Sequence, residues 1–108
     1  MTKNRPAVEL INVDTELACL VSHEARLLWY SDKWVPEGRT NNPADFTGTR
    51  WLEWIHEDDL DSVLDFFASP VRLTIIYRYM NPWDREHSVM QLGKIAHGGD
   101  WFCIACPL

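Results

Sequence analysis

The segment from Gly48 to Phe67, GTRWLEWIHEDDLDSVLDFF, constrains the fold more than any other part of the chain. Its first half spaces Trp51, Trp54 and Ile55 at i, i+3 and i+4, so these large side chains share one face of a helical turn. Its second half begins with acidic residues 57–59, which complement a helix dipole, and continues with an apolar repeat at helical spacing. That repeat consists of Leu60, Val63, Leu64 and Phe67. The sequence therefore predicts a short helix followed by a longer amphipathic one.

Patterns typical of β-strands lie on both sides of these helices. They are residues 17–22 and 27–31 before the helices, and 72–80, 87–92 (with an alternative extension to 96) and 101–106 after them. Because the strands do not alternate with helices, we expect them to form an antiparallel sheet. The predicted fold class is α+β, a five-stranded antiparallel sheet with short helices and one longer helix packed on one face. Residues 17–108 are expected to form this single domain, and residues 1–16 a flanking segment.

Size and charge narrow the possible functions. A chain of 108 residues is long enough for one domain with a hydrophobic core. Its formal net charge of −6 argues against nucleic-acid and anionic-membrane partners, which require a basic surface. No apolar run approaches the roughly 18 residues that a spanning helix needs. Three cysteines, an odd number, fit a reducing compartment. We therefore expect a cytoplasmic location.

Residues 51–60, WLEWIHEDDL, resemble the tryptophan-to-Asp-Asp signature of the PAS family of sensor domains, with Glu57 where that family usually has proline. Tyr77-Arg78, followed by a polar turn and a strand, resembles a second family motif, although Asp84-Arg85 stands where Asp-Gly is usual. The resemblance covers residues 17–106. It implies a PAS-like sheet whose last strand lies at the centre beside the first. It also implies a sensory or interaction module of bacterial signal transduction, without catalysis of its own. Such a module binds a small ligand or a partner and transmits a conformational change to an output domain or protein.

The resemblance also implies a space between helices and sheet where small ligands bind. The candidate lining residues are Trp51, Trp54, Leu64, Phe67, Leu73, Ile75, Tyr77, Trp101 and Cys103. The alternative is that the aromatic side chains fill this space themselves, since each buries a large apolar area. Both interpretations remain open on the sequence alone.

Three groups of residues are candidates for cofactor or metal chemistry. Cys103 and Cys106 form a C-x-x-C, but positions i and i+3 of a strand face opposite sides, and no second pair completes a zinc site. Cys19, on the strand expected to pair with the last one, could approach Cys103, a contact interpreted as packing. His56 with Asp58 and Asp59 is interpreted as the start of the long helix and not as a metal or acid–base site.

Two cofactors known from PAS domains are not favoured. A haem ligand would be a histidine near the long helix, and the histidine there, His56, belongs to the signature. A flavin site would need a cysteine just before the long helix, where this chain has Thr47-Gly48-Thr49-Arg50.

Two further functions remain as alternatives. One is a ligand-free homodimerisation or docking domain, with Val8, Leu10 and Ile11 as an anchor and Ile76 and Val89 on the outer sheet face. The other is a small enzyme that uses the acids near Asp58.

Overall fold

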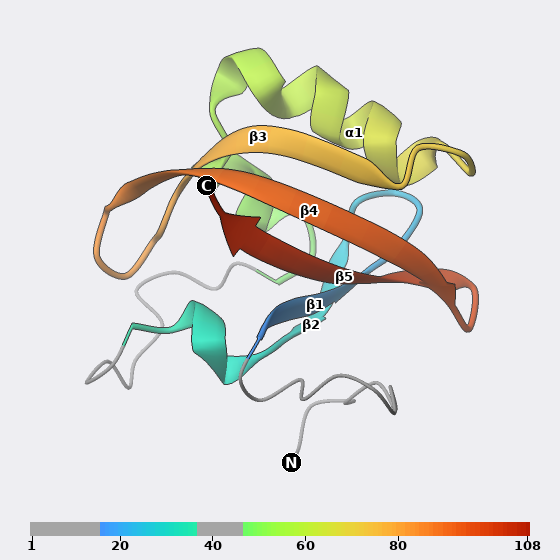
Figure 1. Ribbon diagram of the computed structural model, residues 1–108, viewed down its shortest axis with the longest axis horizontal. Helices are drawn as coiled ribbons and strands as arrows, with labels where there is room; N and C mark the ends of the chain where they lie inside the picture. Colours follow the sequence, from blue (N-terminus) through green and yellow to red (C-terminus); the bar gives the residue numbers. More distant parts are fainter. Residues whose placement is uncertain (1–15, 37–46) are drawn as a thin grey trace.

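The computed structural model describes residues 16–36 and 47–108. Five strands form one antiparallel sheet (Figure 1). They are β1 (Leu17–Val21), β2 (Leu27–Tyr30), β3 (Thr74–Met80), β4 (His87–His97) and β5 (Asp100–Pro107). The α+β class and the antiparallel sheet predicted from the sequence are therefore confirmed.

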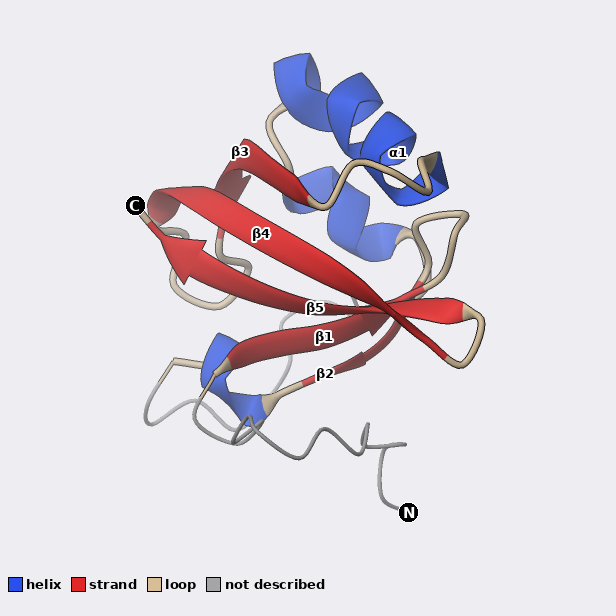
Figure 2. Ribbon diagram, turned by 45° about the vertical axis from the view of Figure 1, so that its right-hand side comes forward, coloured by secondary structure: helices blue, strands red, loops and turns tan. Residues whose placement is uncertain are grey.

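The strands are ordered β2-β1-β5-β4-β3, so β5, the last strand along the chain, lies at the centre. It pairs with β1 on one side and with β4 on the other, and Figure 2 shows this order across the sheet. The register places Cys19 opposite Cys103 and Leu92 opposite Ala105. Two hairpins, β1–β2 and β3–β4, are thus joined through β5.

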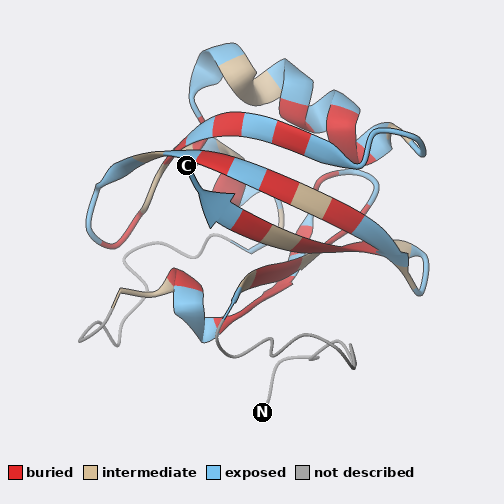
Figure 3. Cartoon of the chain, in the orientation of Figure 1, coloured by how far each residue is buried: buried red, intermediate tan, exposed pale blue. Residues whose placement is uncertain are grey.

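Side chains along β3 and β4 alternate between a buried and an exposed face (Figure 3). Tyr77 and Met90 are paired neighbours on the buried face. Ile76 points to the outer face, where it is 58% exposed. β4 extends to His97, the longer of the two alternatives, because the turn to β5 is only two residues long. Gly98 and Gly99 both have positive φ, as the central residues of a tight type I′ hairpin require.

The helical segments in the described part of the chain all lie between β2 and β3 in the sequence. They are the 3₁₀ turns η1 (Asp32–Trp34), η2 (Arg50–Trp54) and η3 (Glu57–Asp59), and the helix α1 (Leu60–Ala68). Helix α1 lies by β3, whereas η1 lies by β1 and β2 at the other end of the sheet (Figure 2). The expected short helix is therefore the 3₁₀ turn η2, and the longer one is α1.

One side chain caps the turn before α1, and another attaches the start of the helix to the sheet. His56 Nδ1 accepts a hydrogen bond from the Asp58 backbone N–H at 3.1 Å, which caps η3. Asp59 accepts from Arg78 three times, from the backbone N–H at 2.8 Å, from Nε at 2.9 Å and from Nη2 at 2.8 Å. The Arg78 guanidinium and backbone N–H lower the pKa of the Asp59 carboxyl to about 2.

The inward face of α1 differs from the prediction. Val63, Phe66 and Phe67 are buried, whereas Leu64 is 39% exposed. The helix is rotated so that both phenylalanines lie inside, because two phenyl rings remove more apolar surface from water than one leucine does. Leu73 is also outside the core, at 53% exposure. It precedes β3, which begins at Thr74 and not at residue 72 as predicted.

The described part of the chain contains no helix with the length and apolar character needed to cross a bilayer. Residues 1–15 of the expected flanking segment, including Val8, Leu10 and Ile11, lie outside the described residues.

Candidate functional site

A small cavity lies over the centre of the sheet, and its origin is visible in the sequence of β5. The residues of β5 that face the core are Trp101, Cys103 and Ala105, so two small side chains follow one large one. Large side chains from the neighbouring strands and the 3₁₀ turns surround them. The free space lies among these large groups, and no residue of β5 lines it.

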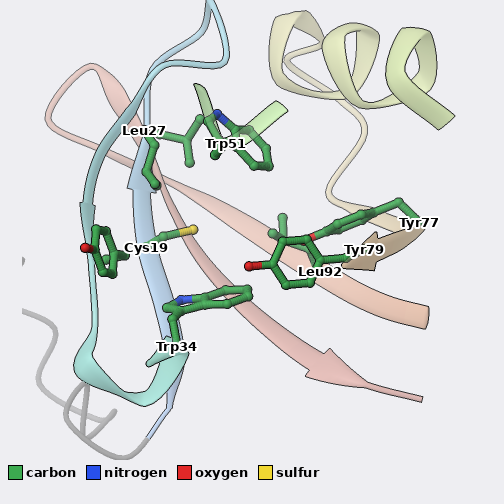
Figure 4. Close-up of a pocket in the computed structure, with 9 residues that line it drawn as sticks. Cys19, Leu27, Trp34, Trp51, Tyr77, Tyr79 and Leu92 are labelled. Atoms are coloured by element: carbon green, nitrogen blue, oxygen red, sulfur yellow. The ribbon is translucent and has the colours of Figure 1, made fainter. Parts of the chain in front are cut away.

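Nine residues from six elements line this cavity (Figure 4). They are Cys19, Val21, Leu27, Tyr30, Trp34, Trp51, Tyr77, Tyr79 and Leu92. All nine are buried in the protein. The lining is therefore apolar except for thiol and phenol groups.

Both tryptophans of the lining are fixed by hydrogen bonds to the backbone of the first hairpin. Trp34 Nε1 donates to the Ala18 carbonyl at 3.0 Å, and Trp51 Nε1 donates to the Ala25 carbonyl at 2.7 Å. Trp34 also meets Tyr79 edge to face, with ring centroids 5.7 Å apart. These contacts satisfy both buried indole N–H groups and hold η1 and η2 as walls of the cavity.

The free space amounts to about 20 Å³ for the centre of a water-sized sphere. One water molecule needs about 10–15 Å³ on this scale, so the cavity has room for one or two molecules of that size. The Tyr79 hydroxyl is buried and has no hydrogen-bond partner among the described residues. Burial raises the pKa of Tyr79 above its ordinary value, so the phenol stays protonated. It is thus a donor available to a small polar molecule.

The nine residues predicted to line the cavity lie in three different environments. Trp51 and Tyr77 line the cavity. Four others, Phe67, Ile75, Trp101 and Cys103, are buried in the core around it. Trp54 is half-buried and lines a surface hollow, while Leu64 and Leu73 are exposed as described above.

Tyr79 was expected from the sequence among the aromatic residues that could face this space. Six other lining residues were absent from the prediction: Cys19, Val21, Leu27, Tyr30, Trp34 and Leu92. Tyr79 shared the predicted inward face of its strand. The pair of small residues at alternate positions of the last strand was a further signal, because it marks where a central strand leaves space.

A buried lysine, Lys94, marks the α1 end of the core. Its Nζ lies 4.0 Å from the centre of the Trp101 ring and 4.4 Å from that of Phe66. It donates hydrogen bonds to the carbonyl of Ser69 at 2.6 Å and to the carbonyl of Phe66. Trp101 Nε1 donates to the Phe67 carbonyl at 2.9 Å. Two side chains from the sheet thus satisfy carbonyls at the end of α1 that have no partner within the helix.

The charge state of Lys94 results from opposing effects. Burial lowers the pKa of its ammonium group from the ordinary value, Cys103 acts in the opposite direction, and Arg72 adds to the lowering. The faces of two aromatic rings and the carbonyl end of a helix both favour a cation. Lys94 is therefore a structural cation that holds α1 on the sheet.

The acidic residues at the start of α1 differ in their exposure and in their partners. Asp58 has a side chain that is 71% exposed, and Asp59 is occupied by Arg78. Within residues 16–36 and 47–108, His, Cys, Asp and Glu side chains form no group of three or more that could hold a metal ion.

Comparison with models of known protein families and with curated proteins finds no match to this sequence.

Proposed function

We propose that this domain is a cytoplasmic sensory and protein-interaction module of the PAS type, acting in bacterial signal transduction. It would bind a small ligand or a partner and pass a conformational change to an output domain or protein, without catalysis of its own. The proposal is carried by the strand order β2-β1-β5-β4-β3, with the described helical segments inserted between β2 and β3. In that order the last strand lies at the centre beside the first, as the resemblance to the family implies.

The turn after β3 adds support. Arg85 stands where the family usually has glycine, and it has φ of 61°, a left-handed conformation that glycine adopts at little cost. Its guanidinium carbon lies 5.4 Å from the centre of the Trp54 ring, a contact that offsets part of the strain. The backbone of this turn thus has the shape that the family motif implies, although the residue differs.

The cavity defines the sensing event that we propose. Its volume admits one or two molecules the size of water, so a larger ligand would have to displace η1 or η2. Trp34 and Trp51 connect these two turns to β1 and to the β1–β2 turn through their indole N–H groups. Displacement of either turn would therefore be transmitted to the first hairpin.

Native mass spectrometry of the protein purified from cells tests this function. We expect a bound small molecule or a stoichiometric partner. Ala105→Leu, which places a larger side chain beneath the cavity, should reduce retention of a small molecule. Ile95→Leu on the outer face is the matched control and should not. Recovery of only the bare monomer, with neither ligand nor partner, would contradict the proposal.

A second candidate function is homodimerisation through the outer face of the sheet. Ile76, Val89 and Ile95 are 58%, 43% and 55% exposed, and all three point away from the helices. Sedimentation tests this candidate directly. Ile76→Glu should dissociate a dimer, whereas Val71→Glu, at an 80% exposed site outside the sheet, should leave it intact. A wild-type protein that stays monomeric at high concentration would exclude this alternative.

A further inference from the structure

Two cysteines face each other across the centre of the sheet. Cys19 of β1 is the register partner of Cys103 of β5. Directly opposed residues of an antiparallel pair have Cα atoms about 4.5–5.5 Å apart, and disulfides span Cα separations of about 4.4–6.8 Å. Both thiols are free and their residues are 5% and 0% exposed. The backbone therefore already holds the two positions at a separation that a disulfide can bridge.

The two thiols differ in their surroundings. Cys19 lines the cavity, and its sulfur points into the free space (Figure 4). Cys103 is fully buried in β5 and does not contribute to the lining. A hydrogen bond with Cys19 and burial raise the pKa of the Cys103 thiol, while the Lys94 ammonium opposes this. Cys103 thus retains its proton, and Cys19 is the sulfur that a molecule in the cavity would meet first.

The cavity sets the size and polarity of that molecule. Space for one or two water-sized molecules accommodates hydrogen peroxide and excludes bulky disulfides such as oxidised glutathione. The buried Tyr79 hydroxyl has no hydrogen-bond partner within residues 16–36 and 47–108, and Tyr79 lines the same space, so its hydroxyl is a donor for a peroxide oxygen. The site therefore combines a thiol, a second thiol beside it and an unused hydrogen-bond donor.

We propose that Cys19 and Cys103 form a peroxide-reactive dithiol, in which Cys19 is attacked first and Cys103 resolves the product. The Cys19 sulfur attacks one oxygen of hydrogen peroxide, the O–O bond breaks, and Cys19 sulfenic acid and one water form. The Cys103 thiol then displaces the sulfenic hydroxyl as a second water, and a Cys19–Cys103 disulfide results. Two thiols lose two electrons and two protons, and one peroxide becomes two waters. An external thiol reductant reverses the reaction.

This chemistry goes beyond the proposed sensory role and does not depend on it, because no signal has to be relayed for the disulfide to form. Its consequence within the fold is local. The bond would link β1 covalently to β5 and draw the Cys19 sulfur away from the cavity.

The test uses folded protein that carries Cys106→Ser, since Cys106 is exposed and would otherwise form disulfides between molecules. After treatment with hydrogen peroxide we expect a mass loss of two hydrogen atoms. Peptide mapping should assign it to a Cys19–Cys103 bond, and dithiothreitol should restore the mass. Adding Cys103→Ala should stop the reaction at a Cys19 sulfenic acid, detected as a mass gain of one oxygen atom on the intact protein. Adding Cys19→Ala should leave Cys103 unmodified at the same peroxide dose.

Two results would overturn the proposal. One is a folded protein whose two thiols stay reduced at peroxide doses that oxidise them after unfolding. The other is oxidation of Cys103 ahead of Cys19. Peptide mapping of the Cys106→Ser protein alone decides the first, so the proposal stays testable even if a core variant does not fold. Failure here leaves the sensory function untouched, because that function is read from ligand or partner retention in untreated protein.

Discussion

The two ends of the core share one sheet face but are completed in different ways. At the α1 end, Lys94 and Trp101 donate hydrogen bonds to the last carbonyls of the helix, and phenylalanine rings fill the space around them. Around the cavity, Trp34 of η1 and Trp51 of η2 donate hydrogen bonds to the backbone of the first hairpin, and Trp51 also meets Phe67 of α1 edge to face. There the Tyr79 hydroxyl has no partner among the described residues, and a cavity remains.

The difference follows from which element covers each end. A regular helix places a row of unpaired carbonyls at its end, and these carbonyls require donors directly beneath it. The 3₁₀ turns instead bring in indoles that donate hydrogen bonds to the first hairpin, and a cavity remains between these indoles and the side chains of β1, β3 and β4. The α1 end is therefore the part of the core with its helix carbonyls satisfied from the sheet, and the cavity lies beside the 3₁₀ turns.

The largest effect is expected at the α1 end. Lys94→Ala removes the donor to the buried Phe66 carbonyl and the part-buried Ser69 carbonyl, together with the contacts of the ammonium group with two rings. Losing these charge-assisted hydrogen bonds and ring contacts should lower the free energy of unfolding by about 3 kcal/mol. Urea denaturation measures this, with Lys33→Ala at an exposed site of η1 as the control. A loss below about 1 kcal/mol would show that the α1 end is not held by Lys94.

The same substitution, valine to isoleucine, can be made in both parts of the core to compare how tightly they are packed. Val63→Ile inserts a methylene into the packed α1 end and should cost about 1–2 kcal/mol through overpacking. Val21 lines the cavity, so Val21→Ile should be neutral or stabilising. Thermal denaturation of both variants gives the difference. Equal costs at the two sites would mean that the core around the cavity is as tightly packed as the α1 end.

A smaller effect, of opposite sign, is expected for Tyr79→Phe. Removing a buried hydroxyl without a partner should raise the free energy of unfolding by about 1 kcal/mol. Chemical denaturation of the two proteins checks this. A loss of similar size would show that the hydroxyl is bonded to a molecule held in the cavity.

The smallest destabilisation is expected at the N-terminal end of α1, where the ion pair between Asp59 and Arg78 is exposed to solvent. Half of the Arg78 side chain is open to solvent, so Asp59→Asn should cost less than Lys94→Ala or Val63→Ile. Because Arg78 lowers the pKa of Asp59 from 3.8 to about 2, the wild-type contribution is complete above pH 3.8 and is lost as the pH falls toward 2. Unfolding followed between pH 5 and 2 should therefore show a shallower decline for Asp59→Asn. Parallel curves would rule out this ion pair as a source of stability.

The sheet could be predicted because its signals are local and periodic. Residues 72–80 alternate clearly, and β3 was found at Thr74–Met80. The face of α1 could not be predicted from spacing alone, since Leu64 and Phe66 compete for the interior and the outcome depends on what lies beneath. Lys94 continues the inward series of Met90 and Leu92, a signal that its charge obscures.

The cavity was harder to predict than the sheet. It depends on how far Trp34 and Trp51 reach over two small residues of β5, and 3₁₀ turns leave no periodic pattern that fixes this reach. The pairing of Cys19 with Cys103, by contrast, was expected from the strand order, and the register confirms it.

The central place of β5 has a consequence for how the protein is made. During synthesis the β1–β2 and β3–β4 hairpins leave the ribosome before residues 100–107, and each then has an unpaired inner edge. Neither hairpin alone buries enough surface to be stable. The cooperative step must therefore wait for the final strand, which brings together segments about 80 residues apart and closes the loop with the highest entropic cost. Until then both open edges are available to other chains, so aggregation of nascent protein should be most sensitive to changes in β5.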